Sequence, residues 1–318
     1  MRIVSLLPAA TEMVCAVGGA ADLVGVSHEC DFPDAVRGLP VLTRARIGGL
    51  PSSVGIDAAV RTLVSEALSV YAVDDHRLAE LAPDVVITQD LCDVCAVSLD
   101  DVRAALASLA GRESVRIVSL RPTCLANVLD DVDAVALALG RSETGARARR
   151  ALQGRIDAVA VRAARAKGRP RVLTIEWLDP IMLGGLWMPE LIELAGGEPV
   201  GVRAGEPAVT VTPAELAALV PDVVLVKPCG FALARTLDER ACIEGPIARA
   251  VGPHARIHAS DGNAFFNRPG PRLVESLEIL AACVHPEAFG DLVAKHAVAM
   301  RCLSRAGGRG TSVTPDWV

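Results

Sequence analysis

Four side chains in the first third of the chain have the types and spacing of a soft-metal site. Cys92 and Cys95 form a Cys-x-x-Cys pair, and His28 and Cys30 stand two positions apart in the segment SHEC. Thiolate and imidazole groups are the ligands that zinc and iron commonly take in proteins. Our hypothesis is therefore a zinc or iron site with His28, Cys30, Cys92 and Cys95 as its ligands.

The same residues allow other interpretations. The thiols could be small buried core residues, which is where free cysteines are often found. A Cys-x-x-Cys pair could also be a redox pair, although the thioredoxin-type motif belongs at a helix start in a smaller fold. A thiolate nucleophile activated by His28 is a further alternative that has no fixed spacing behind it. Because the sequence has no second Cys-x-x-Cys pair, it does not choose among them.

Two other segments have the composition of a ligand-binding surface. The first, at 177–188, holds two tryptophans and two methionines, which either pack in the core or contact a flat hydrophobic ligand. The second, at 263–270, combines two phenylalanines with one arginine, and its glycine and proline content predicts an exposed loop at the mouth of a cleft. The candidate ligand-binding residues are His28, Arg44, Trp177, Trp187, Cys229, Asp261, Phe265, Phe266 and Arg268.

A repeated stretch indicates which elements position these residues. LAELAPDVVITQ at 78–89 and LAALVPDVVLVK at 216–227 agree at seven positions in the same order. Each copy is typical of a helix end, a Pro-Asp turn and a buried strand rich in β-branched residues, as in parallel sheets covered on both faces. A unit repeated once at this distance predicts two lobes, each with its own parallel sheet.

The candidate residues follow the predicted strands. Ligands of open parallel sheets bind beyond the carboxyl ends of the strands. Strands are expected at 2–7, 23–27, 84–89, 115–120, 171–176, 222–227 and 256–259. The residues that follow these strands directly or closely include His28, Cys30, Cys92, Cys95, Cys124, Glu176, Trp177, Cys229 and Asp261.

The remaining pattern predicts how the chain is divided. A helix is expected over 57–82, and a longer one from 142 to about 166 is the candidate connector, with an arginine-rich face expected in solvent. The predicted organisation is an N-terminal α/β lobe at 1–124, a bridging helical segment at 125–169, a C-terminal α/β lobe with its closing helix at 170–303, and a loose tail at 304–318.

Composition excludes several classes of partner. The chain has 318 residues, a net charge of −6 and only 3% aromatic residues, which argues against binding to nucleic acid. It has no apolar run long enough to span a membrane. Pro8, Thr11 and Glu12 interrupt the first apolar stretch, so neither a signal peptide nor a lipoprotein site is expected. The predicted compartment is therefore the cytoplasm, where nine cysteines would be thiols or ligands.

The order of several motifs resembles a known family. These motifs are the opening RIVSLLPAATEMVCAVGGAADLVGVS, the LxxLxPDVV stretch of each half, WMPELIELAGGEPV after the bridging helix and GPRLVESLEILA near the end. Over about residues 1–290 they resemble the helical-backbone class of metal-chelate substrate-binding proteins. These are the vitamin B12-, haem- and siderophore-binding components of ABC importers, and the cobalamin-binding branch is the most similar.

The resemblance implies a fold and a function. The fold would be two Rossmann-like α/β lobes with parallel sheets, joined by one long bridging helix, with the ligand held between them. The ligand would be a small-molecule metal chelate, with a corrinoid such as cobalamin favoured over haem or a siderophore, and with His28 or a cysteine as axial donor. An ABC permease would be the partner of an exported form. The alternative is a cytoplasmic enzyme or metal-handling protein that uses the Cys/His site.

Overall fold

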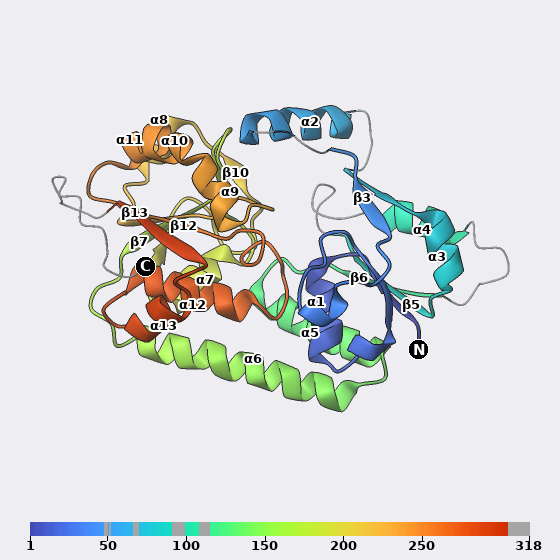
Figure 1. Ribbon diagram of the computed structural model, residues 1–318. Helices are drawn as coiled ribbons and strands as arrows, with labels where there is room; N and C mark the ends of the chain where they lie inside the picture. Colours follow the sequence, from blue (N-terminus) through green and yellow to red (C-terminus); the bar gives the residue numbers. More distant parts are fainter. Residues whose placement is uncertain (48–49, 51, 66–69, 91–98, 108–114, 305–318) are drawn as a thin grey trace.

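The computed structural model describes residues 1–47, 50, 52–65, 70–90, 99–107 and 115–304. These residues form two α/β lobes, and one long helix, α6 (Ser142–Ala163), runs beneath both of them (Figure 1). The predicted fold class, two lobes with parallel sheets and a bridging helix, is confirmed. No helix among the described residues is both long and apolar enough to cross a bilayer.

The N-terminal lobe is built on a four-stranded parallel sheet of order β2-β1-β5-β6. Its two central strands are buried, and successive side chains alternate between two layers: Ile3 belongs to the layer of α1 and α5, and Val4 to that of α3 and α4. The elements are β1 (Ile3–Ser5), α1 (Pro8–Ala16), the short helices η1 (Ala20–Asp22) and η2 (Asp34–Val36), β2 (Leu23–Val26), α3 (Asp75–Leu81), β5 (Val85–Gln89), α4 (Leu99–Ala107), β6 (Arg116–Leu120) and α5 (Leu125–Ala138).

The C-terminal lobe has a larger mixed sheet of order β10-β8-β7-β11-β12-β13, in which β9 also pairs with β7. The central strands β7, β11 and β12 are parallel, and antiparallel strands flank them. The elements are β7 (Arg171–Trp177), β8 (Met182–Leu183), α7 (Met188–Leu194), β9 (Glu198–Pro199), β10 (Val209–Thr210), α8 (Pro213–Ala218), β11 (Val223–Val226), α9 (Leu233–Asp238), α10 (Arg240–Cys242), the π-helical η3 (Ile243–Ile247), α11 (Ala248–Val251), β12 (Arg256–Ser260), α12 (Leu273–Val284), α13 (Gly290–Lys295) and β13 (Met300–Ser304).

The repeated stretches make equivalent contacts in the two lobes. In each copy the residue before the proline is left-handed, with φ of 46° and 43°, and ends the preceding helix segment. Asp84 then accepts the backbone N–H of Arg2 at 2.7 Å, and Asp222 accepts that of Arg171 at 2.8 Å. The guanidinium groups of both arginines bind carbonyls at the ends of those helix segments. The Pro-Asp turn therefore ties each central strand to the strand that opens its lobe.

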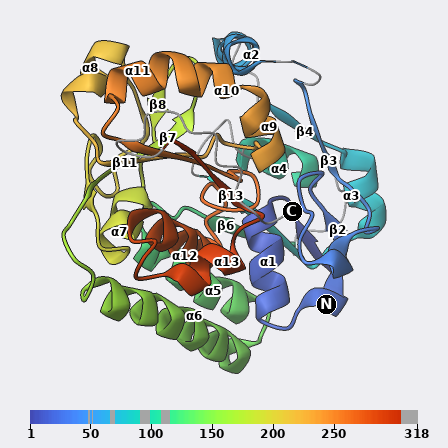
Figure 2. The same cartoon turned by 60° about the vertical axis from the view of Figure 1, so that its left-hand side comes forward.

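The bridging helix α6 packs against α5 of the first lobe and against α7 and α12 of the second (Figure 2). Its buried residues Ile156, Val159 and Ala163 belong to a hydrophobic core that extends without interruption from α1 and α5 to α7 and α12. The two lobes therefore share one core layer, and each lobe has a further hydrophobic cluster of its own.

The arginine-rich face of α6 is less solvated than expected. Arg149 pairs with two aspartates of α5 at 2.7 and 2.8 Å. Arg155 pairs with two glutamates of α12 at 2.8 and 2.9 Å, and Arg162 binds Asp291 of α13. The expectation of a fully solvated face is wrong for these three residues, because helices of both lobes approach the same side of α6.

The helix expected over 57–82 is also interrupted. The chain forms α2 (Ser53–Ser65), then β4 (Tyr71–Val73), which pairs antiparallel with β3 (Thr43–Ala45), and only then α3. The Asp74 side chain accepts the N–H of Arg77 and starts α3. The start of α2 reaches the other lobe, where the Ser53 N–H and hydroxyl both donate to the Glu239 carboxylate, at 2.9 and 2.5 Å.

Glu278 of α12 is a strongly perturbed carboxyl beside α6. It is 7% exposed and accepts hydrogen bonds from Arg155, Lys295 and His296. Burial raises the pKa of Glu278, but these hydrogen bonds outweigh it and lower the pKa to about 2. The folded pKa therefore lies below the unfolded value near 4.5, so the group stabilises the fold above pH 4.5, and this stabilisation is lost as the pH falls towards 2.

We expect Glu278→Gln to lower the free energy of unfolding by about 3 kcal/mol at neutral pH, because Arg155 and Lys295 lose a buried counter-charge. Urea unfolding at a series of pH values measures this loss, which should shrink as the pH falls below 4.5. The control is Glu275→Gln, which contacts the same Arg155 but is more exposed and should cost less than about 1 kcal/mol. Equal losses in the two variants, or a loss independent of pH, would contradict the assignment.

Candidate functional site

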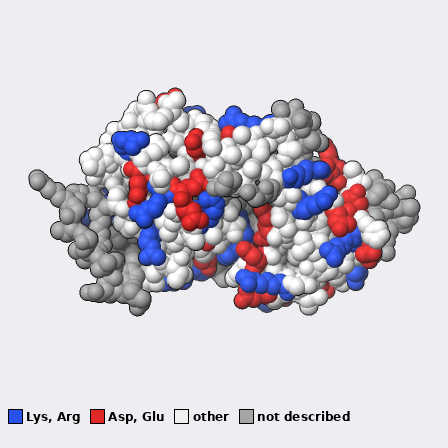
Figure 3. Space-filling model, turned by 45° about the horizontal axis from the view of Figure 1, so that its top comes forward, with Lys and Arg blue, Asp and Glu red and all other residues white. Residues whose placement is uncertain are grey.

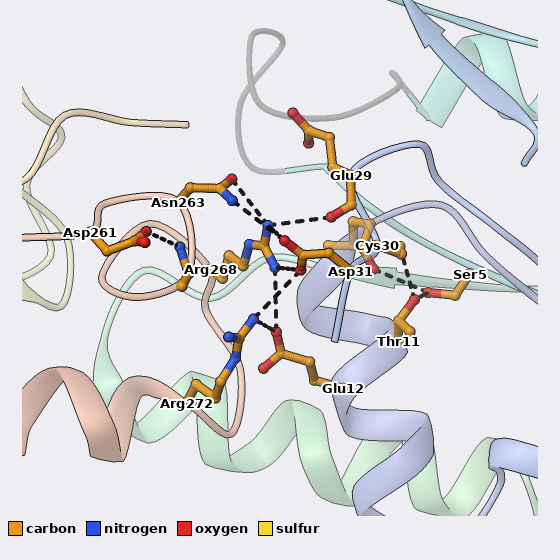
Figure 4. A network of polar contacts seen from close by, with 12 residues as sticks. Ser5, Thr11, Glu12, Glu29, Cys30, Asp31, Asp261, Asn263, Arg268 and Arg272 are labelled. Atoms are coloured by element: carbon orange, nitrogen blue, oxygen red, sulfur yellow. Dashed lines mark hydrogen bonds and ion pairs between the residues drawn. The ribbon is translucent and has the colours of Figure 1, made fainter. Parts of the chain in front are cut away.

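The carboxyl ends of the two sheets meet at one place between the lobes. The 27–31 segment follows β2, and the 261–272 segment follows β12 (Figure 4). Arg268 donates to Asp31 at 2.5 Å, and Asn263 donates to the same carboxylate at 3.5 Å. The topology therefore brings together residues that follow strands of the two lobes and are more than 230 positions apart in the sequence. The carboxyl ends of parallel strands are where such sheets bind their ligands.

Arg268 and Arg272 form a cross-lobe ion cluster with Asp31 and Glu12. Arg268 is 7% exposed, and Arg272 donates to Glu12 of α1 at 2.5 Å (Figure 4). Burial raises the pKa of Asp31, but the hydrogen bond and charge of Arg268 outweigh it and hold that pKa below its usual range. Two guanidinium groups thus face two carboxylates, and the charge of the predicted ligand residue Arg268 is balanced within the protein.

We expect Asp31→Asn to lower the free energy of unfolding by about 2 kcal/mol, because it leaves the nearly buried Arg268 without its closest counter-charge. Chemical denaturation of the full chain measures the change. The matched control is Asp34→Asn, an exposed aspartate three positions further along, which should stay within about 0.5 kcal/mol of the parent. Equal effects at the two positions would show that the cross-lobe pair contributes nothing specific.

His28 lies at the carboxyl end of β2 with its side chain exposed. Its Nδ1 lies 2.7 Å from the Thr43 hydroxyl of β3, and its ring lies 5.2 Å from that of Tyr71 of β4. The Tyr71 hydroxyl donates to Glu29 at 3.0 Å. Desolvation by the surrounding protein lowers the pKa of His28, and the nearby Glu29 only partly opposes it, so the imidazole is neutral at pH 7. A neutral imidazole is the form that binds metals.

Cys30 has a different environment from His28, two positions before it. Its Sγ lies 3.1 Å from the Thr11 hydroxyl, which donates to Ser5, and the Ser5 hydroxyl donates to the Leu7 carbonyl. With the Thr11 proton committed to Ser5, the Cys30 thiol is the donor to Thr11 (Figure 4). Burial raises the pKa of Cys30 to about 11. In this arrangement Cys30 is a protonated thiol, which is a poor nucleophile.

We expect Cys30 to react with iodoacetamide about 100-fold more slowly than an ordinary thiol near neutral pH, because its thiolate is scarce and buried. Peptide mass spectrometry after timed alkylation of the folded chain measures the rate, with the exposed Cys302 as internal reference. Labelling of Cys30 as fast as Cys302 would refute the assignment.

The predicted four-ligand metal site is not tested by the structure, because Cys92 and Cys95 lie outside the described residues. Among the residues that are described, no group of three or more His, Cys, Asp and Glu side chains is arranged to hold a metal ion. The zinc or iron site therefore stays a prediction.

The C-terminal lobe contributes an aromatic pair and a buried ion pair. The rings of Trp177, at the end of β7, and Phe231 lie 5.3 Å apart. Lys227 follows β11, is 1% exposed, and donates to Glu176 and to Asn267, both at 2.9 Å. Sequence reasoning missed Lys227. The sequence signal was its position directly after four apolar residues of a buried strand, where a buried charge needs a partner.

The other candidates occupy different environments. Trp187 and Phe266 are buried, and the indole N–H of Trp187 donates to the Phe266 carbonyl at 2.8 Å, which matches the core-packing alternative. Asp261 accepts the N–H of Ala264 and shapes the 261–272 segment. The remaining three are Arg44, exposed on β3, Cys229, half-buried beside Glu176, and Phe265, half-buried near Arg272.

Charge on the surface is mixed. On the face drawn in Figure 3, lysines and arginines are interspersed with aspartates and glutamates over both lobes. The described residues on this face thus form no uniform basic surface of the kind that polyanions bind.

Together, the fold and the facing strand ends define a two-lobed α/β protein with its candidate site between the lobes. The family model described as periplasmic binding protein matches residues 3–241, and the chain belongs to that family. The resemblance inferred from the sequence motifs is thereby confirmed at the level of the family. A comparison with curated proteins finds no match.

Several solved structures share the fold. A periplasmic haem-binding protein from Pseudomonas aeruginosa has a TM-score of 0.66 and 20% identity, covering 96% of this chain and 95% of the other. The periplasmic vitamin B12-binding protein BtuF of Vibrio cholerae has a TM-score of 0.62 and 20% identity, covering 90% and 97%. A possible iron-binding periplasmic solute-binding protein from Staphylococcus epidermidis has a TM-score of 0.66 and 18% identity, covering 89% and 98%.

These comparisons correct one expectation. The cytoplasmic location expected from the first 20 residues is wrong, because the family and the structural neighbours are periplasmic binding proteins. The expectation was based on the composition of the first 20 residues. In this fold that segment forms β1 and α1, so its composition reflects the fold and does not report the compartment.

Proposed function

We propose that this chain binds a metal chelate between its two lobes, with a corrinoid such as cobalamin as the favoured ligand. The observation that carries the proposal is His28, an exposed and neutral imidazole at a strand end, next to Glu29, whose carbonyl accepts a hydrogen bond from Arg268 of the facing lobe. Its Nδ1 is held by Thr43, and its Nε2 makes no hydrogen bond within the part of the chain that is described. An imidazole arranged in this way is suited to be an axial donor.

A chelated metal needs little from the protein. A corrinoid or a haem supplies the equatorial ligands, so that one axial donor is enough to coordinate the metal. A bare ion would need several protein ligands, and the candidates for such a set are His28 and Cys30 with two residues that are not described. Among the described residues a chelate therefore needs only His28, whose Nδ1 is held by Thr43.

The facing lobe offers contacts that suit the body of such a ligand. Trp177 at the end of β7 is partly exposed and packs against the buried Phe231, and pockets for small molecules are lined mainly by apolar and aromatic groups. The cross-lobe ion cluster has balanced charge, which removes a strong preference for an anionic ligand. Membership in the periplasmic binding protein family supports a role in delivering the ligand to an ABC permease.

We expect the purified chain to bind aquocobalamin and to change its visible spectrum, because imidazole replaces the axial water. His28→Ala should lose the spectral change and bind about tenfold or more weakly. The matched control is His76→Ala, which removes an exposed histidine of α3 whose partner is Glu80 at 3.4 Å and should leave binding unchanged. Spectral titration and equilibrium dialysis measure the two effects.

Failure of the parent chain to bind aquocobalamin would refute the corrinoid assignment. Binding of haemin in its place, with the same dependence on His28, would replace the corrinoid by haem. Binding of either ligand with no change in His28→Ala would remove His28 from the site.

A further inference from the structure

The hydroxyl of Thr43 has three hydrogen-bond neighbours, and together they define the protonation of His28. The backbone N–H of His28 donates to Thr43 Oγ1 at 3.0 Å, and Nδ1 of the same residue lies 2.7 Å from that oxygen. Thr43 in turn donates to the Ser27 hydroxyl at 3.0 Å. Both hydroxyl residues are buried, at 6% and 4% exposure, so water does not compete for these positions.

The protons can be assigned one by one. A hydroxyl has one proton and two lone pairs. The Thr43 proton goes to Ser27, so both lone pairs of Thr43 accept, one from the backbone N–H of His28 and one from its ring. Nδ1 must therefore carry the ring proton, and in the neutral imidazole Nε2 is then left with its lone pair.

We propose that Thr43 and Ser27 are positioning residues that hold His28 in the Nδ1–H tautomer, so that Nε2 is the donor atom to the metal of the chelate. This inference rests on the proposed function and narrows the ligand class. A single nitrogen donor binds only a metal that has an open or exchangeable axial position, as in aquocobalamin or haem. A siderophore complex whose iron already has six oxygen ligands offers no such position.

The surroundings of His28 agree with this role. Metal-binding histidines commonly donate their other ring N–H to a fixed acceptor, which orients the ring. Here that acceptor is on β3, and the neighbouring strand β4 places the Tyr71 ring against the imidazole at an angle of 50°. Tyr71 is itself held by its hydrogen bond to Glu29. The ring of His28 is thus oriented by Thr43 of β3 and by Tyr71 of β4, and Tyr71 is fixed by Glu29 of the same segment as His28.

The first test measures the tautomer directly in the full chain without ligand. Long-range proton–nitrogen NMR correlation of protein with labelled histidine distinguishes Nδ1–H from Nε2–H, and His28→Ala assigns the signals among the six histidines. We expect Nδ1–H in the parent and in Thr43→Ser, which keeps the hydroxyl. Ser27→Ala frees the Thr43 proton to donate to Nδ1, so this variant should shift His28 towards Nε2–H. An Nε2–H tautomer in the parent would overturn the inference.

The second test uses named chelates. Thr43→Val should bind aquocobalamin about tenfold more weakly than the parent, Thr43→Ser should restore binding, and cyanocobalamin should respond much less because cyanide occupies its upper axial position. Ferric desferrioxamine is expected to bind weakly and without dependence on Thr43. Circular dichroism and thermal unfolding of each variant show that it is folded.

The outcomes separate the two proposals. If no cobalamin or haemin binds to any folded variant, the proposed function is wrong, whereas the tautomer is still read from the NMR spectra. If aquocobalamin binds to the parent and to Thr43→Val equally well, or ferric desferrioxamine binds as tightly as aquocobalamin, the positioning role and the narrower ligand class are wrong while chelate binding stands.

Discussion

The arrangement of the two lobes depends on a hydrophobic core that continues across the boundary between them. Side chains of β1, α1 and α5 in the first lobe and of β11, α7 and α12 in the second belong to one buried cluster, and α6 lies along it. Opening the lobes widely would expose this cluster at a cost of about 25 cal/mol for each Å² of apolar surface. The ion pairs from Arg268 and Arg272 to Asp31 and Glu12 join the same lobes nearer to the strand ends. Such a frame permits small adjustments around a site, and it suits a rigid ligand.

Much of this frame could be predicted from the sequence, because it depends on local patterns that occur twice. The Pro-Asp turn depends only on the residues beside it and on one arginine at the start of the lobe. Asp84 and Asp222 therefore indicate the same local structure in both lobes. The connector α6 was predictable from its apolar spacing for a similar reason. The helix expected over 57–82 was wrong, because pairing of β4 with β3 overrides local helical preference, and this pairing is a tertiary contact.

The candidate site was predictable only in outline. The composition of 263–270 predicted an exposed loop at the mouth of a cleft, but it did not reveal that Asp31 neutralises Arg268. Thr43 and Lys227 were missed for the same physical reason. Their importance comes from partners 15 to 51 positions away, and no sequence period connects a residue with such a partner. Burial then makes these contacts obligatory, because a buried polar group without a partner is costly.

The segment after β2 illustrates how the fold separates residues that look equivalent in sequence. His28 and Cys30 are two positions apart and are both candidate metal donors, yet they bond to different elements, His28 to Thr43 of β3 and Cys30 to Thr11 of α1. The Cys30 thiol donates a hydrogen bond to Thr11, within a buried chain of hydroxyl groups beside α1. The imidazole of His28 bonds to Thr43 through its Nδ1, and the side chain of His28 is exposed. In each case a threonine hydroxyl is the hydrogen-bond partner, while burial of the thiol and of the imidazole favours the neutral form of both groups. A pattern of donors in a sequence therefore becomes a pattern of ligands only after the hydrogen bonds of each donor have been counted, and that count supports our proposal that the exposed nitrogen of His28 is the donor.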